Sequence, residues 1–175
     1  DSVPDISMGR IPADTVDELS DYLAKVDTYR NSAPEGQWEE SMIFINDDSD
    51  GVPADEVFPD YNLELAAIVP AGYNNIMIGL ETYADPADCT ADIIFNIEQG
   101  ALVCEYLGHG GTYLWADERI FADSDIIARS DARDLFSPDH MYPFFISIAC
   151  FDGLFIEPDE DWFMSLSERL LLNPS

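Results

Sequence analysis

Four short apolar segments, separated by segments with helical patterns, constrain the fold of this chain more than any other feature. Each apolar segment is hydrophobic nearly throughout instead of alternating with polar residues, which is typical of strands buried on both faces. The segments cover residues 41–46, 75–80, 101–107 and 142–150. Strands that alternate with helices along a chain form a parallel sheet covered by helices. We therefore predict an α/β fold with a mostly parallel sheet and helices on both of its faces.

The helical segments carry recognisable start and stop signals. In "DTVDELSDYLAKVDTYR", Thr15 and Glu18 have the spacing of a capping box, and apolar residues follow at helical spacing. Those apolar residues are Val16, Leu19, Leu23 and Val26. In "PADCTADIIFNIEQG", Pro86 marks a helix start and Gly100 stands just past its end. Further helices are expected over residues 60–69, 124–129 and 160–175.

Length and charge exclude several classes of protein. The chain has 175 residues, of which 47% are hydrophobic and 12% aromatic, so we expect one domain over residues 1–175. It has no run of 18 or more apolar residues, so we expect no membrane span. With 36 acidic and 7 basic residues the formal net charge is -29. Such a charge repels a phosphate backbone and an anionic lipid surface, so no nucleic-acid partner is expected.

The acidity has two explanations that can both hold. Disordered acidic chains are poor in aromatic and branched apolar residues, and this chain is not, so we expect a folded protein with an acidic solvated surface. Adaptation to a salt-rich, halophilic environment is the first explanation, because salt screens the repulsion between surface carboxylates. A cationic peptide substrate is the second.

Cysteine and acidic motifs give little support to a metal or cofactor site. The three cysteines are Cys89, Cys104 and Cys150. An odd count is no disulfide framework, although one disulfide and one free thiol would fit. No CxxC pair or HExxH motif is present, so we expect no metal site and no required cofactor. The turn "NDDSDG" keeps a structural calcium ion open as an alternative, although the twelfth position from Asp47 is Phe58 instead of Glu.

Two residues that can carry chemistry stand where apolar segments end. His109 follows the segment over 101–107, and Cys150 ends the segment over 142–150. Functional groups of open parallel sheets gather beyond the carboxyl ends of the strands, and neighbouring strands lie about 5 Å apart. A thiol beside an imidazole is the minimum for nucleophilic acyl transfer, because the imidazole generates the thiolate. Cysteine is also among the most buried residue types, so spacing alone leaves core packing and catalysis equally open.

Glycines surround the histidine in "YLGHGG". They allow the backbone to approach a substrate closely, because glycine has no side chain to obstruct it. The N–H groups of Gly110 and Cys150 are therefore candidate donors for an oxyanion hole, which needs fixed donors where negative charge develops.

The segments around both residues resemble a known family. An apolar strand ending "YLGHGG", then a Trp, then an apolar strand ending "IACFDG", resembles the gingipain-type cysteine peptidases of the caspase-like clan. The similarity extends, in the family's order, to "PDISMGRIPADTVDELSDYLAKVDTYR", "MIFINDDSDG" and "SLSERLLLNP". The resemblance implies a caspase-like sandwich. It also implies a cysteine endopeptidase that hydrolyses peptide bonds through an acyl-enzyme.

The resemblance assigns roles to individual positions. Cys150 matches the nucleophile, His109 the catalytic histidine and Gly110 the oxyanion glycine. Asp48 lies near the acidic residue that helps to orient the histidine in some members, and Trp115 is expected either to line the substrate cleft or to pack in the core. Members specific for Arg or Lys use an acidic residue in the substrate pocket. The candidates here are Asp55, Glu56 and Asp60, with a solvated turn as the alternative reading of all four acidic residues.

The resemblance covers only the central portion of a catalytic domain. It implies a preceding subdomain and further strands of the same sheet, so we expect an exposed apolar sheet edge in this chain. The expected partners are a protein or peptide substrate and the remaining segments of the same polypeptide. The implied location is extracellular or on the cell surface. Two alternatives to hydrolysis stay open: transpeptidation, in which an amine replaces water, and a non-catalytic caspase-fold module of a secreted or surface protein.

Raising the salt concentration is expected to raise the melting temperature of the protein. At about 1 M salt the Debye length is only about 3 Å, so most of the repulsion among the carboxylates is screened. Thermal unfolding followed by circular dichroism across a sodium chloride series measures this. A melting temperature that stays constant or falls as salt rises would contradict the interpretation.

Overall fold

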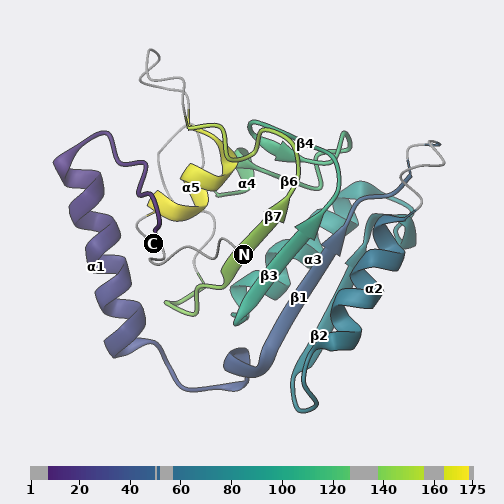
Figure 1. The fold of residues 1–175 in the computed structure, drawn as a ribbon, viewed down its shortest axis with the longest axis horizontal. Coiled ribbons are helices and arrows are strands. Elements are labelled where there is room, and N and C mark those ends of the chain that lie inside the picture. The colour runs from purple at the N-terminus through teal and green to yellow at the C-terminus, as the bar shows by residue number, and fades with distance from the viewer. Residues whose placement is uncertain (1–7, 50, 52–56, 127–137, 156–163, 174–175) are drawn as a thin grey trace, which may run out of the picture.

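A four-stranded parallel sheet forms the centre of the computed structural model, which describes residues 8–49, 51, 57–126, 138–155 and 164–173 (Figure 1). Its strand order is β2-β1-β3-β7. The strands are β1 (Ser41–Asn46), β2 (Asn74–Gly79), β3 (Val103–Leu107) and β7 (Phe144–Ile148). Each of the four predicted apolar segments contains one of these strands or overlaps it, and every pair of neighbours is parallel. The predicted sheet is confirmed.

Helices cover both faces of this sheet. Alternate strand residues point to opposite sides, so apolar side chains on each face pack against a helix. On one face, α3 (Pro86–Glu98) contributes its own residues Cys89, Ile93 and Ile97 to the core. The core residues that the strands contribute are Ile43, Ile45, Ile78, Cys104 and Tyr106. On the other face, α2 (Phe58–Ile68) packs on β1, where the Asn62 side chain donates to Asn46 Oδ1 over 3.4 Å. Helices on both faces are thereby confirmed.

Two helices stand beyond the β7 side of the sheet, α1 (Val16–Ser32) and α5 (Leu166–Leu172), and they contact each other. The predicted capping box of α1 is present, with Thr15 Oγ1 accepting from Glu18 N over 3.1 Å. Lys25 joins the helices. Its Nζ donates to the carbonyl oxygens of Leu170 (3.1 Å), Leu171 (3.4 Å) and Asn173 (3.0 Å). These carbonyls lie at the end of α5, where helix carbonyls lack helical partners.

The apolar stripe predicted for α1 is not buried in the described part of the chain. Val16 is 79% exposed and Leu23 is 53% exposed. The periodicity therefore predicted the helix correctly, and the spacing by itself does not determine whether the apolar residues are buried. Of the helix predicted over 160–175, the structure describes residues 164–173, and the helix within them begins at Leu166.

A small antiparallel sheet follows His109. It consists of β4 (Gly110–Gly111), β5 (Leu114–Trp115) and β6 (Phe121–Ala122). The strands have two residues each, too short for an alternating pattern to be visible in the sequence. The short elements that complete the described fold are α4 (Asp123–Ile126) and the 3-10 helices η1 (Gln37–Glu40) and η2 (Leu80–Thr82).

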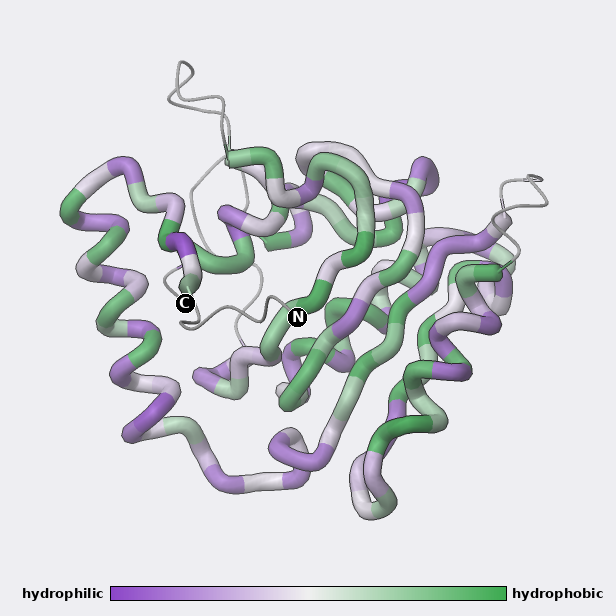
Figure 2. Tube along the Cα trace, in the orientation of Figure 1, coloured by the Kyte–Doolittle hydropathy of each residue, from purple (hydrophilic) through white to green (hydrophobic). Residues whose placement is uncertain are grey.

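One edge of the main sheet presents apolar side chains to solvent. Among the described strands β7 has a single neighbour, β3, and Figure 2 shows hydrophobic residues along both. Phe144 is 68% exposed, Ile146 39% and Ile148 50%. Phe144 N donates to Leu102 O over 2.9 Å, so the alternate peptide groups of Phe145 and Ser147 point away from β3. The edge of β7 therefore offers both apolar side chains and main-chain groups to another segment.

Glu105 is a buried carboxyl group in the middle of β3. It is 4% exposed, and neither carboxylate oxygen has a hydrogen-bond partner among the residues that the structure describes. By strand register it shares a face with Phe44 and Ile146. Burial raises its pKa from 4.5 to about 7, because a charged carboxylate is poorly solvated among apolar side chains.

The free energy of unfolding should depend on pH through Glu105. Its pKa is higher in the folded than in the unfolded protein, so the stability it provides when protonated is lost as pH rises from about 4.5 to about 7. We expect Glu105→Gln to remove this loss. Between pH 4.5 and pH 8, the free energy of unfolding of the variant should rise by up to about 3 kcal/mol relative to that of the wild type. Urea unfolding across this range measures it, with exposed Glu64→Gln as the control. Parallel pH curves for wild type and Glu105→Gln would contradict the assignment.

Candidate active site

The pairing of β3 with β7 brings His109 and Cys150 to the same edge of the sheet. Leu107 and Ile148 are register partners, and Gly108 N donates to Ile148 O over 3.3 Å. His109 and Cys150 each stand two residues beyond these partners. The histidine is half-buried and Cys150 is exposed. The adjacency on which the predicted dyad depended is therefore present in the fold.

The two loops touch at Gly110. A Cβ atom added to this glycine would lie 2.9 Å from Ala149 Cβ, 3.1 Å from Cys150 O and 3.5 Å from Cys150 N. The loop of the histidine and the loop of the cysteine are thus in main-chain contact, with no room for a side chain at position 110.

Hydrogen bonds hold the main chain of His109 on both sides. Its N–H donates to Asp47 Oδ2 over 2.9 Å. Its carbonyl oxygen accepts from the Tyr106 hydroxyl over 2.5 Å and from Ala116 N over 2.9 Å. Burial raises the pKa of Tyr106, which keeps the hydroxyl protonated as a donor. The position of the histidine therefore depends on Asp47, which follows β1, and on Tyr106, near the end of β3.

Asp47 is a site residue that the sequence analysis missed. It is fully buried, and its Oδ1 accepts from Asp48 N over 2.9 Å while Oδ2 accepts from His109 N. Its own N–H donates to Leu107 O over 3.1 Å and so extends the pairing of β1 with β3. The signal for it was present: Asp47 follows an apolar strand directly, at the same edge as His109.

The other acidic residues singled out from the sequence lie around the start of α2. Phe58, the first residue of α2, packs edge-on against the His109 ring, with centroids 5.5 Å apart at 82°. Asp60 is exposed in the first turn of this helix, and Asp48 is half-buried beside Asp47. Asp55 and Glu56 lie outside the described residues. The roles expected for these four residues stay predictions.

Cys150 stands at the beginning of a tight turn. Asp152 N donates to Cys150 O over 2.9 Å, and Phe151 between them has a φ of 63°. A left-handed φ at a bulky residue is disfavoured by on the order of 1–3 kcal/mol and persists only where surrounding contacts hold it. This three-residue turn ends β7 abruptly and leaves the Cys150 side chain exposed.

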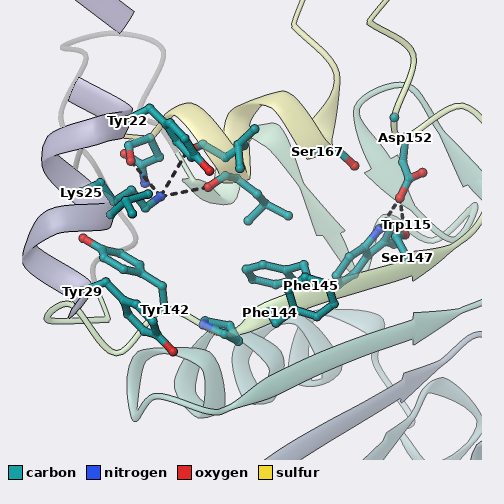
Figure 3. Close-up of a pocket in the computed structure, with 16 residues that line it drawn as sticks. Tyr22, Lys25, Tyr29, Trp115, Tyr142, Phe144, Phe145, Ser147, Asp152 and Ser167 are labelled. Carbon is teal, nitrogen blue, oxygen red and sulfur yellow. Dashed lines mark hydrogen bonds between the residues drawn. The ribbon is translucent and has the colours of Figure 1, made fainter. Parts of the chain in front are cut away.

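Trp115 is a buried residue that contacts the turn following Cys150. It is 1% exposed, and its ring stacks on Tyr106 with centroids 4.5 Å apart at 13°. Its Nε1 donates to Asp152 Oδ2 over 3.1 Å (Figure 3). The burial shows that Trp115 packs in the core, and a place in the wall of the substrate cleft stays a prediction.

The other two cysteines are buried core residues. Cys89 and Cys104 are each 0% exposed, and all three cysteines are free thiols. Burial raises the pKa of Cys89 to about 12 and raises that of Cys104 as well. Neither forms a thiolate at neutral pH, so Cys150 is the cysteine available for nucleophilic chemistry.

Within the described ranges, no group of three or more His, Cys, Asp or Glu side chains is placed to hold a metal ion. The turn "NDDSDG" is described only in part, so the structural calcium ion stays a prediction. No helix in the described part of the chain has the length and hydrophobicity needed to cross a membrane.

Comparison with known proteins identifies the family. The family model described as peptidase family C25 matches residues 1–175. This chain belongs to peptidase family C25. The gingipain-type resemblance found in the sequence is thereby confirmed. No curated protein sequence matches the chain.

Two solved structures share the fold. One is the complex of Porphyromonas gingivalis RgpB pro- and mature domains, with a TM-score of 0.73 and 19% identity over 95% of this chain. The other is the Arg specific cysteine proteinase gingipain R (RGPB), with a TM-score of 0.68 and 18% identity over 91% of this chain. The likeness confirms the caspase-like fold. The chain spans 37% and 34% of those two structures, about a third of their length.

Replacing Gly110 by alanine should destabilise the protein, and replacing Gly111 should not. The Cβ at position 110 would press on Ala149 and Cys150, whereas the Cβ at position 111 would lie 3.7 Å from Leu114, an ordinary contact. Overpacking of this kind costs about 1–3 kcal/mol, while the gain from a stiffer unfolded chain is common to both variants. Urea unfolding of the two variants measures the difference. Equal stabilities would show that the two loops are further apart than described.

Proposed function

We propose that the protein is a cysteine endopeptidase in which Cys150 is the nucleophile and His109 the general base and acid. The observation that carries the proposal is the contact, in a C25 chain, between the loops that present these residues from adjacent strand ends. Cys150 is the exposed thiol of the chain, and a thiol close to an imidazole is the arrangement that acyl transfer requires.

The proposed reaction has two stages. His109 accepts the thiol proton of Cys150, and the thiolate attacks the scissile carbonyl carbon to form a tetrahedral oxyanion. The N–H groups of Gly110 and Cys150 donate to this oxyanion, which they stabilise more strongly than the ground-state carbonyl. His109 then donates its proton to the leaving amine, and an acyl-enzyme remains. Water, deprotonated by His109, attacks the acyl-enzyme and releases the acid product.

The proposed substrate carries a basic residue at the cleavage position. One solved relative is titled an Arg specific cysteine proteinase. Asp60 supports the same preference here, because it lies two residues from Phe58, which contacts the His109 ring. Asp55 and Glu56 are the alternative partners of the basic side chain. Asp48 is proposed to orient His109 from the end of β1. The net charge of -29 favours a cationic substrate over an anionic one.

We also propose that other segments of the polypeptide complete the catalytic domain. The exposed apolar edge of β7 supports this, as does a groove of about 570 Å³ between α1, α5 and β7. Aromatic side chains line much of this groove, among them Tyr22, Tyr29, Tyr142 and Phe145 (Figure 3). An unpaired strand edge beside an apolar groove is a surface that monomeric proteins normally cover. The proposed location is outside the cell or on its surface.

Cleavage of basic peptides should require Cys150 and His109. Cys150→Ala and His109→Ala are each expected to lower kcat/KM on the order of 10⁴-fold or more, since the two residues act as a unit. The other histidine of the chain provides a matched control, and His140→Ala should cleave like the wild type. Mass spectrometry of a peptide pool with arginine, lysine or neutral residues at the cleavage position measures it, on protein with every segment that its gene encodes.

The same assay separates the alternatives. Products joined to an added amine would show transpeptidation instead of hydrolysis. Equal cleavage by wild type and Cys150→Ala would reject the nucleophile, and no cleavage by the wild type would leave the non-catalytic module as the function.

A further inference from the structure

We infer that Asp152 is a positioning residue that fixes the Cys150 turn relative to the loop of His109. The inference deepens the proposed peptidase function and rests on it for its catalytic consequence. Asp152 is 5% exposed and lies two residues after the nucleophile. It lies in the motif "IACFDG", to which the sequence assigned a role only at Cys150, and the role of Asp152 follows from its contacts.

The main chain of Asp152 closes the turn and anchors it. Its N–H donates to Cys150 O over 2.9 Å, and its carbonyl oxygen accepts from Ser167 N over 2.9 Å. Ser167 lies in the first turn of α5, whose N–H groups have no helical partners of their own. The helix end is thereby used to hold the turn that presents the nucleophile.

The side chain of Asp152 joins two further elements. Its Oδ2 accepts from Trp115 Nε1 over 3.1 Å and from the Ser147 hydroxyl, as the dashed lines in Figure 3 show. Ser147 belongs to β7, the strand that leads to Cys150, and Trp115 belongs to β5. One carboxylate oxygen therefore connects the nucleophile's own strand with the small sheet that follows His109.

Trp115 carries the connection to the histidine. It is the register partner of Gly110 in the pairing of β4 with β5, and the next residue, Ala116, donates from its N–H to His109 O over 2.9 Å. The Trp115 ring also stacks on Tyr106, whose hydroxyl donates to the same carbonyl oxygen. Both routes from Trp115 end on the main chain of His109. Asp152 thus contacts the cysteine loop directly and the histidine loop through one side chain.

A second link runs through the start of α5. Leu166 N donates to Thr112 O over 2.7 Å, and Thr112 lies between β4 and β5. The adjacent N–H, from Ser167, donates to Asp152 O. Successive residues of one helix end therefore bind the histidine loop and the cysteine loop.

The strain at Phe151 explains why the turn needs these contacts. A left-handed φ at a non-glycine residue persists only where its surroundings hold it. Hydrogen bonds to a carboxylate are stronger than those between neutral groups, and those of Asp152 are shielded from solvent. Without Oδ2, the buried Trp115 N–H and the Ser147 hydroxyl lose an acceptor. The turn is then free to relax, and Cys150 moves relative to His109.

Two variants of Asp152 separate positioning from packing. Asparagine keeps one side-chain oxygen that can accept from both Trp115 and Ser147, whereas alanine keeps none. We expect Asp152→Ala to lower kcat about 100-fold with little change in KM, because a shift of about 1 Å in a reacting group has that effect. Asp152→Asn should restore most of the wild-type kcat. Asp125→Ala, which removes a half-buried carboxylate that accepts from Ala122 N over 2.8 Å, should leave kcat unchanged.

A chemical cross-link reports the geometry without relying on turnover. 1,3-Dibromoacetone loses one bromide to the Cys150 thiolate and the other to an imidazole nitrogen of His109, which bridges the two side chains only when they are close. Mass spectrometry of peptic fragments gives the bridged fraction, and the burial of Cys89 and Cys104 restricts the reaction to Cys150. We expect a high bridged fraction in the wild type, Asp152→Asn and Asp125→Ala. Asp152→Ala should react at Cys150 and bridge poorly.

The outcomes distinguish the inference from the function on which it rests. A wild type that neither cleaves peptides nor forms the bridge would overturn both. Cleavage and bridging by a folded Asp152→Ala at wild-type levels would overturn the positioning role alone. Bridging that depends on Asp152 in a protein that cleaves nothing would support the positioning role while rejecting the peptidase.

Discussion

The parallel pairing of β3 with β7 determines where the groups of the candidate site lie. Leu107 and Ile148 are register partners, so β3 and β7 end at the same edge of the sheet. His109 and Cys150 each follow two residues later. The close approach of Gly110 to Ala149 and Cys150 depends on the same pairing. A shift of register by one residue would turn Cys104 and Tyr106 out of the core and separate the two loops. Burial of those side chains in the core cluster that also holds Ile93, Ile97 and Trp115 therefore also fixes the geometry of the site.

Two buried carboxylates, Asp47 and Asp152, hold the loops that leave this edge of the sheet. A third, Glu105, is buried without hydrogen-bond donors among the described residues. Asp47 and Asp152 each accept at least two hydrogen bonds at strand ends, where main-chain and side-chain donors converge. Glu105 lies within a strand, where the N–H groups pair with neighbouring strands, and burial raises its pKa to about 7. In a chain with a net charge of -29, the few buried acids are thus distinguished by the donors around them.

The sequence was most informative where a pattern is local and repeated. The strands follow from uniformly apolar segments, and α1 and α3 from their caps, because each signal lies within a few residues of the element it predicts. His109 and Cys150 could be placed together because parallel strands share an edge. Asp152 and Trp115 could not, since their contact joins residues 37 positions apart through strands of two residues. The exposed stripe of α1 was equally unpredictable, because periodicity reports an apolar face and not what covers it.

The place of β7 in the sheet explains why so many contacts converge on the cysteine turn. A central strand is fixed by neighbours on both sides, whereas β7 has β3 alone among the described strands. Its end is held instead by contacts that are not strand pairing: Ser147 to Asp152, Asp152 to Trp115, and the first turn of α5 to Asp152. These contacts lie on the side of the groove, where another segment would also pack. A segment that packs in this groove would therefore lie against the side chains of Ser147, Asp152 and Trp115, which hold the Cys150 turn.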